Sequence, residues 1–411
     1  MNSRRFRASV KVFVAFNLAF VLAESTPMIG QSATLPDDRR TEIVAPGIEH
    51  IEIRRGNFTP GTNGDRWTIH VLWIDPAQAR LVLARAMDEA VGTETTSSLA
   101  ARHGAAAGVN GGYFRTTGLY KGEPTGLLAF GARVWSEPSP RRTALAVSTA
   151  GGRIRAAVAA VDFTAALEAA DGASHPVSGV DRPREADELI VFGPEFHRTT
   201  LTGSGGIEVV VKGQAFAGEM DPQANPGAPA TVDKDRVAAV IDGTGSQPIP
   251  ATGYVVSASG TAADWVRAHL KTGSPVRLRT EFKFDPSPPF EPEFLLGAGP
   301  RLVAAGTAAS DPGLQFYPED FTNSRHPRTA AGARKDGRLA LVTVDGRQPA
   351  KSVGMTIAEL SALMLELGCD EAINLDGGGS TTMVVNGKVV NSPSDAAGER
   401  AVSDALLVIK K

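Results

Sequence analysis

The sequence predicts an α+β fold: a single large domain on a mixed, mainly antiparallel sheet, with packed helices and a β-rich middle insertion. Three observations support this prediction. Strand-like runs outnumber amphipathic helical stretches. Turn signals such as Asn386-Gly387 and Asp75-Pro76 stand between neighbouring runs. The 411 residues, 42% hydrophobic and 21% charged, have the balance of a globular protein with a sizeable core.

The N-terminal segment predicts export. Residues 1–23 combine a basic start with an apolar run over 12–23, which is typical of a signal peptide, and cleavage as late as residue 33 is compatible with the sequence. The apolar run is shorter than the ~20 residues that span a bilayer, so no stable membrane anchor is expected after cleavage. We expect an exposed leader over 34–65, a folded domain over 66–411, and a periplasmic or extracellular protein.

The first half of the domain contains strands and one short helix. Residues 67–74 and 80–84 read as strands around Asp75-Pro76, which predicts a hairpin. A helical stretch around 98–103 leads into a small-residue strand that ends at Asn110. The middle, 150–295, alternates strand runs with loops rich in proline and glycine, and a helix is expected over 262–270.

The C-terminal third gives the clearest pattern. Residues 338–345 form a strong β run that we expect to pair with the segment around 328–332. Thr356 and Glu359 form a capping box before an apolar helical stripe that ends at Gly368. Strands follow over 372–376, over 383–390 as a hairpin, and over 405–409.

The turn after residue 376 is the sharpest local feature. Three consecutive glycines after a strand give up side-chain packing in favour of access to the backbone. Their N–H groups could form an anion-binding nest, to which two hydroxyls would add donors. A tight turn that serves only the backbone is the alternative interpretation. The candidate ligand-binding residues of this turn are Asn374, Asp376, Gly377, Gly378, Gly379, Ser380 and Thr381.

Three other places could contribute to the same site. Asn110-Gly111-Gly112 repeats the pattern of a strand that ends in an amide and glycines, and Glu123 lies in a constrained loop. Arg328 and Arg347 flank the predicted pair of strands, and arginine suits bidentate phosphate recognition. The alternative interpretations are that the glycine motif is only a hairpin turn, that the glutamate is solvated in its loop, and that the arginines are surface charges.

Composition and missing motifs exclude several classes of protein. The net charge is -3, with 42 Lys and Arg scattered among 45 Asp and Glu, so no nucleic-acid partner is expected. The glycine turn lacks the Gly-Lys-Ser/Thr ending of a P-loop, and neither a His-Glu-x-x-His zinc signature nor a Gly-x-Ser-x-Gly elbow is present. No metal site and no required cofactor are therefore predicted.

The motifs taken together resemble the phosphodiester glycosidase family. They are Asn110 to Phe114, Arg328 to Gly332, Val344 to Arg347 and Ile373 to Ser380, and the resemblance extends from about Trp67 to the C-terminus. It implies an enzyme that removes a sugar from a sugar–phosphate–alcohol diester and leaves a phosphomonoester. It also implies the site positions Asn110, Glu123, Arg328, Thr329, Asp345, Asn374, Asp376, Gly377 to Ser380 and, less securely, Arg347.

The chemistry of such a reaction suggests a role for each group. The leaving phosphate monoester has a second pKa of roughly 6, so the protein needs charge stabilisation more than a strong acid. Asp376 or Glu123 would act at the sugar as nucleophile or as the base that activates water. A separation of roughly 5 Å between them favours retention and roughly 6.5–9.5 Å inversion.

Two other classes of function remain open on the sequence. One is a non-catalytic binder of cell-envelope glycopolymers that uses the glycine turns as a cradle. The other is a metal-dependent phosphodiesterase, with Asp345 and Asp376 as ligands of a divalent cation.

Overall fold

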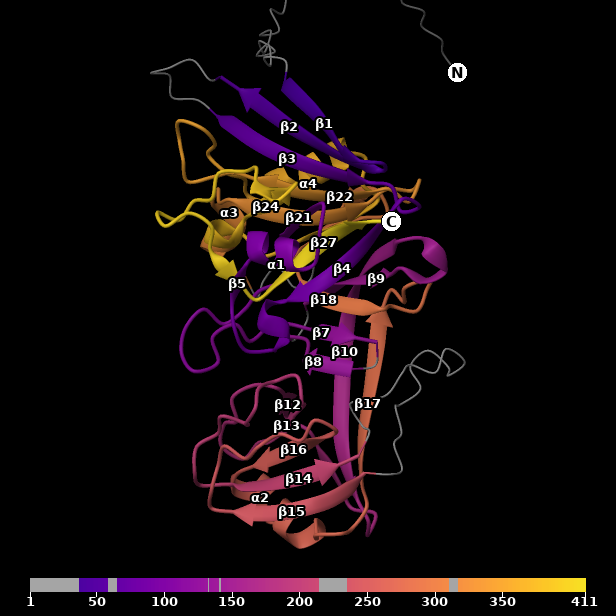
Figure 1. Cartoon of the computed structure of the whole chain (residues 1–411), viewed down its shortest axis with the longest axis vertical. Coiled ribbons are helices and arrows are strands. Elements are labelled where there is room, and N and C mark those ends of the chain that lie inside the picture. The colour runs from indigo at the N-terminus through magenta and orange to yellow at the C-terminus, as the bar shows by residue number, and fades with distance from the viewer. Residues whose placement is uncertain (1–36, 58–64, 132, 140–141, 214–234, 310–316) are drawn as a thin grey trace, which may run out of the picture. The chain divides into compact units, whose positions relative to one another are not determined.

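The computed structural model describes residues 37–57, 65–131, 133–139, 142–213, 235–309 and 317–411. Over these residues the protein is mainly β, with several largely antiparallel sheets and few short helices (Figure 1). The predicted single large sheet is therefore wrong. Periodicity along a segment indicates a strand, but the choice of partner depends on contacts between distant parts of the chain.

The largest sheet has eight strands, and every pair of neighbours in it is antiparallel. Helix α4 (Ile357–Glu366) packs on one face, where Leu360 and Met364 join a buried cluster with Val71 and Val342. In spatial order the strands are β1 (Asp38–Ala45), β2 (Ile48–Gly56), β3 (Arg66–Ile74), β22 (Leu339–Val344), β21 (Arg328–Ala333), β23 (Glu371–Asn374), β19 (Arg301–Ala304) and β20 (Thr307–Ala308).

A five-stranded sheet shares a core with the opposite face of this sheet. Leu72 and Leu341 of the large sheet belong to one buried cluster with Val109 and Leu406 of the smaller one. The smaller sheet has the order β25 (Lys388–Val389), β24 (Met383–Val385), β6 (Ala107–Asn110), β27 (Asp404–Lys410) and β4 (Ala79–Arg85). This shared core allows the ends of β6 and β23, far apart in sequence, to meet.

A seven-stranded sheet carries the middle of the chain. Its longest strand, β10 (Arg155–Ala169), pairs over ten residues with β17 (Val276–Asp285). The other strands are β11 (Ser174–Pro176), β9 (Thr143–Ser148), β18 (Phe294–Ala298), β7 (Leu128–Phe130) and β8 (Arg133–Ser136).

The described residues of the middle section, 150–295, are rich in strands and have their own core. Val209 and Val256 of a second five-stranded sheet pack with Val266 of α2 (Gly260–His269) and with Leu167 of β10. This sheet lies beside one end of the β10–β17 pair (Figure 1). Its strands are β12 (Gly179–Val180), β13 (Leu189–Phe192), β16 (Gly253–Ala258), β14 (Ile207–Lys212) and β15 (Arg236–Asp242).

The remaining elements are short. They are a two-stranded sheet of β5 (Glu94–Thr95) with β26 (Ala401–Val402), and the helices α1 (Thr96–Arg102) and α3 (Glu319–Asn323).

The described part of the predicted leader 34–65, mainly residues 37–57, forms strands and is not an exposed leader. Strands β1 and β2 occupy the edge of the large sheet, and β2 pairs with β3 along its whole length. Most of β1 is exposed because it is the outermost strand, so its polar residues fit an edge position. The predicted signal segment, 1–23 with cleavage as late as 33, lies outside the described residues.

The hairpin predicted over 67–84 is also wrong, although both strands exist. Strand β3 pairs with β2 and β22, whereas β4 pairs with β27 in the other sheet. The turn at Asp75-Pro76 thus carries the chain from one sheet to the other.

Local signals in the C-terminal third are confirmed. Thr356 and Glu359 form the reciprocal capping box at the start of α4. Asn386 and Gly387 both have positive φ between β24 and β25, as a type I′ turn requires. The longest described helices, α2 and α4, have only 10 residues each, and none spans a bilayer.

Two stacked histidines are buried between β2 and β3. His50 Nε2 lies 3.1 Å from His70 Nδ1, and His70 is 3% exposed. Burial and, to a smaller extent, the neighbouring His50 lower the pKa of His70 to about 3. Both rings are therefore neutral near pH 7.

This pair predicts a loss of stability in mild acid. Because the pKa of His70 is lower in the folded than in the unfolded chain, its contribution is complete above the unfolded pKa of roughly 6.5 and is lost as pH falls toward 3. We expect the free energy of unfolding to decline more steeply between about pH 6.5 and 4.5 in the wild type than in a His70→Leu variant. Urea titrations across this range measure it. His197→Leu, outside the pair, is the control, and equal pH slopes in wild type and His70→Leu would contradict the assignment.

Candidate active site

Asn110, at the end of β6, links the two glycine turns. Its Nδ2 donates to the Asp376 carbonyl over 2.7 Å, and its Oδ1 accepts from Thr329 Oγ1 at 2.8 Å and from the Thr382 amide at 3.1 Å. The Asp376 amide in turn donates to the Gly111 carbonyl. The predicted meeting of these two turns, with Thr329 beside them, is therefore observed.

The double glycine rests against a buried carboxylate. Asp404 Oδ1 accepts from the Gly112 amide at 2.7 Å, and Asp404 also pairs with Arg85, whose guanidinium is fully buried. A Cβ on Gly111 would lie 2.0 Å from Asp404 Oδ1. Glycine is needed here for this close approach and not for access by a ligand.

The close contact between Gly111 and Asp404 predicts that a methyl group added at Gly111 destabilises the protein. We expect Gly111→Ala to lower the free energy of unfolding by about 1–3 kcal/mol, because Asp404 must shift away from Arg85 or from the Gly112 amide. Chemical denaturation measures the loss. Gly203→Ala is the matched control, since its Cβ would meet nothing within 4 Å. Equal stability of the two variants would contradict the packing described.

Three amides of the triple glycine turn already have partners within the protein. The Gly377 amide donates to Asp376 Oδ1, the Gly378 amide to Pro327 O, and the Ser380 amide to Gly377 O. The expected anion-binding nest is therefore not available on these N–H groups. The glycines instead admit neighbouring side chains: Gly378 has a φ of 60°, and a Cβ on it would lie 3.1 Å from Arg347 Nη2.

Gly379 admits an ion pair. A Cβ there would lie 2.1 Å from Arg400 Nη2 and 2.2 Å from Asp395 Oδ1, which pair with each other beside the turn. Ser380 and Thr381 are buried under the turn, so their hydroxyls face the protein interior.

Asp376 is the carboxylate at the centre of the turn. Although part of it reaches the surface, dense protein packing raises its pKa to about 6, against hydrogen bonds from Ser380 and the Gly377 amide that lower it. Arg400 also lowers this pKa, whereas Asp404 raises it. Near pH 7 Asp376 is mainly ionised and can act as a base or nucleophile.

Arg328, at the start of β21, is a buried cation. The residue is 1% exposed, and its guanidinium donates to the Met355 carbonyl at 2.8 Å and to the Phe321 carbonyl at 2.6 Å. Burial and, to a smaller extent, the nearby charge of Arg347 lower its pKa to about 10. No carboxylate lies within ion-pair distance of Arg328 or Arg347 in the described part of the chain.

Such a pair of arginines is suited to an anion. Arg347 is exposed beside the glycine turn, with His326 Nδ1 at 3.4 Å from its Nη2. Two mutually repelling guanidiniums without a carboxylate partner gain free energy when a phosphate binds between them.

Tyr113 follows the double glycine and lies among the polar groups of the site. Its hydroxyl accepts from Asn374 Nδ2 at 2.7 Å and donates to the Gly299 carbonyl at 2.6 Å. Burial raises the pKa of Tyr113, as does the nearby charge of Asp376, whereas the nearby Arg142 and Arg328 lower it.

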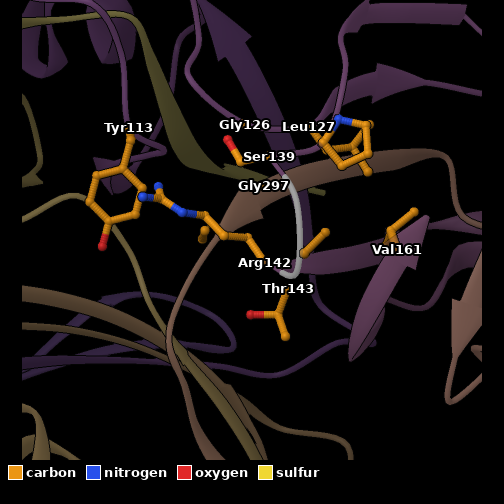
Figure 2. A pocket seen from close by; sticks show the side chains of 11 residues that line it. Tyr113, Gly126, Leu127, Ser139, Arg142, Thr143, Val161 and Gly297 are labelled. Atoms are coloured by element: carbon orange, nitrogen blue, oxygen red, sulfur yellow. The ribbon is translucent and has the colours of Figure 1, made fainter. Parts of the chain in front are cut away.

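Arg142 adds a third cation. Figure 2 shows its guanidinium directed toward the Tyr113 ring, and its Cζ lies 5.5 Å from the centre of that ring and 4.6 Å from the centre of the Tyr317 ring. Arg142 and Tyr317 could not be predicted from motifs. Neither lies in a recognisable motif, and only the fold brings them together beside Tyr113.

Asp345 lies farther from the reacting groups than its motif suggests. Its Oδ1 accepts from Asn391 Nδ2 at 3.1 Å and from the Ser392 amide at 2.9 Å. Asn391 also donates to the Thr381 carbonyl, so Asp345 braces the end of the glycine turn. Burial raises its pKa to about 6. Among the residues described, no three His, Cys, Asp or Glu side chains are grouped to hold a metal ion.

Glu123 lies in a different environment from Asp376. Its carboxylate is 2.8 Å from Arg115 Nε, and the other charges that act on it belong to Glu137 and Arg182. Burial raises its pKa to about 7. Glu123 lines a cleft of about 560 Å³, whereas Asn110, Asn374, Asp376 and the two arginines gather around the glycine turns.

Comparisons with known proteins agree on one family. Residues 226–409 match the family model described as phosphodiester glycosidase. A bovine N-acetylglucosamine-1-phosphodiester alpha-N-acetylglucosaminidase is 41% identical over 75 residues, which cover 18% of this chain and 14% of that protein. The SPbeta prophage-derived uncharacterized protein YomE of Bacillus subtilis (strain 168) is 48% identical over 86 residues, 21% of this chain and 13% of that protein.

Solved structures support the whole fold. A “Putative exported protein” from Burkholderia pseudomallei K96243 superposes with a TM-score of 0.74 at 25% identity, and covers 92% of this chain and 97% of its own. A hypothetical protein from Synechocystis gives a TM-score of 0.69 at 20% identity, over 92% of this chain and 64% of that one.

The matching segments span about one seventh of those two sequence relatives. The family model covers the C-terminal strands that carry Arg328, Asp345 and Asp376. Over residues 226–409 the chain is therefore similar to the phosphodiester glycosidase family.

Proposed function

We propose that the chain hydrolyses the bond between the anomeric carbon of a sugar and the phosphate of a sugar-1-phosphodiester. Water adds across this bond, so the products are the free sugar and a phosphomonoester of the second alcohol. The observation that carries the proposal is the buried guanidinium of Arg328, which adjoins Arg347 and has no carboxylate partner among the described residues.

The arginines account for the leaving group. Negative charge grows on the phosphate as its bond to the sugar breaks, and preorganised cations stabilise this charge with little rearrangement. Arg328 is held by the Met355 and Phe321 carbonyls, so its guanidinium is already oriented. Because a phosphate monoester leaves readily near neutral pH, no strong general acid is required.

Asp376 accounts for the sugar side. Positive charge grows on the anomeric carbon, and a carboxylate at that point either attacks the carbon or takes the proton of the attacking water. Asn374 and Tyr113 lie beside this carboxylate and are the polar groups that would orient the sugar hydroxyls. Asp345 acts through Asn391 and the turn, as a positioning residue.

We further propose that the protein is exported and that its substrate is a sugar-phosphodiester or a cell-envelope glycopolymer. The predicted signal segment supports export, as does the description of the Burkholderia structure as an exported protein. The name of the bovine relative supports a sugar-1-phosphodiester as the substrate class. No cofactor enters the proposed reaction.

Product analysis tests the proposal. The purified protein is incubated with a panel of sugar-1-phosphodiesters, with and without chelator, and the products are separated by mass. Free sugar and phosphomonoester, in equal amounts and unchanged by chelator, are expected. Sugar phosphate as the product, or loss of turnover in chelator, would instead support a metal-dependent phosphodiesterase. Binding without turnover would support a non-catalytic glycopolymer binder.

A further inference from the structure

Glu123 lines a cleft that does not include Asp376 and that the proposed reaction does not use. Its volume of about 560 Å³ lies within the range of about 300–1,000 Å³ that is usual for ligand sites. Its walls come from the 115–125 loop, from the end of β8, from β10 and from the loop before β12.

The charged groups of the cleft are already paired. Arg115 pairs with Glu123 at 2.8 Å, and Arg182 pairs with Glu137 at 2.6 Å and with Glu188 at 2.8 Å. Because both guanidiniums have carboxylate partners, the cleft does not attract an anion as the arginines beside the glycine turn do. Arg115 still presents donors at the rim, because its pair with Glu123 uses only its Nε, whereas every N–H group of Arg182 already has a partner.

One aromatic side chain completes this lining. Phe163 of β10 is half-buried, and its ring is fixed against Phe282 of β17 with 5.2 Å between centres. An apolar ring face beside paired donors and acceptors suits a ligand with C–H faces and many hydroxyls, which is the chemistry of a saccharide.

The cleft adjoins the candidate active site. Pro138 and Ser139 line both this cleft and the small hollow beside Tyr113 and Arg142 (Figure 2). Ser139 also donates to the Thr125 carbonyl, while the Thr125 amide donates to the Tyr113 carbonyl, so two hydrogen bonds link the cleft to Tyr113 at the candidate active site.

We propose that this cleft is a second binding site that takes a neutral oligosaccharide chain. The chain would belong to the same substrate whose phosphodiester lies at Arg328 and Asp376. The inference rests on the proposed function for that link, but binding of a neutral saccharide to the cleft is independent of catalysis.

Titration of the full-length protein with four neutral trisaccharides tests it: chitotriose, cellotriose, maltotriose and mannotriose. We expect at least one to bind with a Kd below about 1 mM. Thr164→Trp places a bulky ring at an exposed position of the cleft wall and should weaken this binding at least about tenfold. Lys283→Trp, exposed on the adjacent strand and outside the lining, is the control and should bind as the wild type does.

Two outcomes would overturn the inference: no binding of any of the four trisaccharides, or binding that Thr164→Trp leaves unchanged. Circular dichroism of each variant checks the fold. Asp376→Asn should bind the trisaccharide as the wild type does, since Asp376 lies outside this cleft. If the proposed function fails, turnover is absent while the trisaccharide still binds. If the cleft inference fails, turnover is present while no trisaccharide binds to the cleft.

Discussion

Replacing Arg328 with alanine is expected to weaken phosphate binding by about 2–5 kcal/mol, or roughly 30-fold to several thousand-fold. The guanidinium is buried, is oriented by two backbone carbonyls and lacks a carboxylate partner among the described residues, so a bound phosphate would supply its counter-charge. Inorganic phosphate as a competitive inhibitor gives the measurement: its inhibition constant should rise by this factor. Arg328→Lys should recover only part of the loss, because lysine cannot donate in the fork geometry of arginine.

The control for this variant is three residues away. Arg325 pairs with Asp65 and Glu359, so Arg325→Ala removes the same charge without touching the proposed phosphate site. Thermal unfolding of both variants separates a loss of binding from a loss of fold. An unchanged inhibition constant in a folded Arg328→Ala protein would remove Arg328 from the phosphate site.

Replacing Asp376 with asparagine is expected to lower kcat by about 10²–10⁴-fold, whether the carboxylate is nucleophile or base. Asparagine keeps an oxygen that can accept from the Gly377 amide, so the turn should persist. In the wild type, activity should fall as pH drops below about 6, because the raised pKa of Asp376 leaves the carboxyl protonated there. Steady-state kinetics from pH 4.5 to 8 measure both effects.

Asp336→Asn, in an exposed turn, is the matched control and should keep the wild-type rate. Wild-type kcat in the Asp376→Asn variant would exclude this carboxylate from the chemistry. If the residual activity of Asp376→Asn still fell below about pH 6 as in the wild type, another group would be responsible for this pH dependence.

Local patterns predicted the elements of the fold better than their arrangement. The capping box at Thr356 and the Asn386-Gly387 turn depend on neighbours in sequence, so both were predictable. The partners of β3 and β4 were not. Burial in one core shared by the large sheet and the β6 sheet decides them, and no short-range signal describes that core.

In the candidate site, too, local motifs were predictable from the sequence, whereas contacts between distant residues were less so. The motifs around Asn110 and Asp376 predicted that two distant turns meet, and the contact between these residues bears this out. The role of the glycines was less predictable, because the carboxylate that Gly111 approaches is Asp404, almost 300 residues away. Arg142 could not be assigned, since only the packing of its side chain against Tyr113 places it at the site.

The central claim is that the bond between the sugar and the phosphate oxygen breaks. The product that receives the oxygen atom of the attacking water tests this most directly. Hydrolysis of a sugar-1-phosphodiester in H₂¹⁸O, followed by mass spectrometry of both products, shows which bond breaks. We predict that the label enters the sugar and that the phosphomonoester stays unlabelled, since the sugar–oxygen bond breaks while the arginines hold the departing phosphate. Label in the phosphate would show cleavage at phosphorus and would contradict the roles given to Arg328 and Asp376.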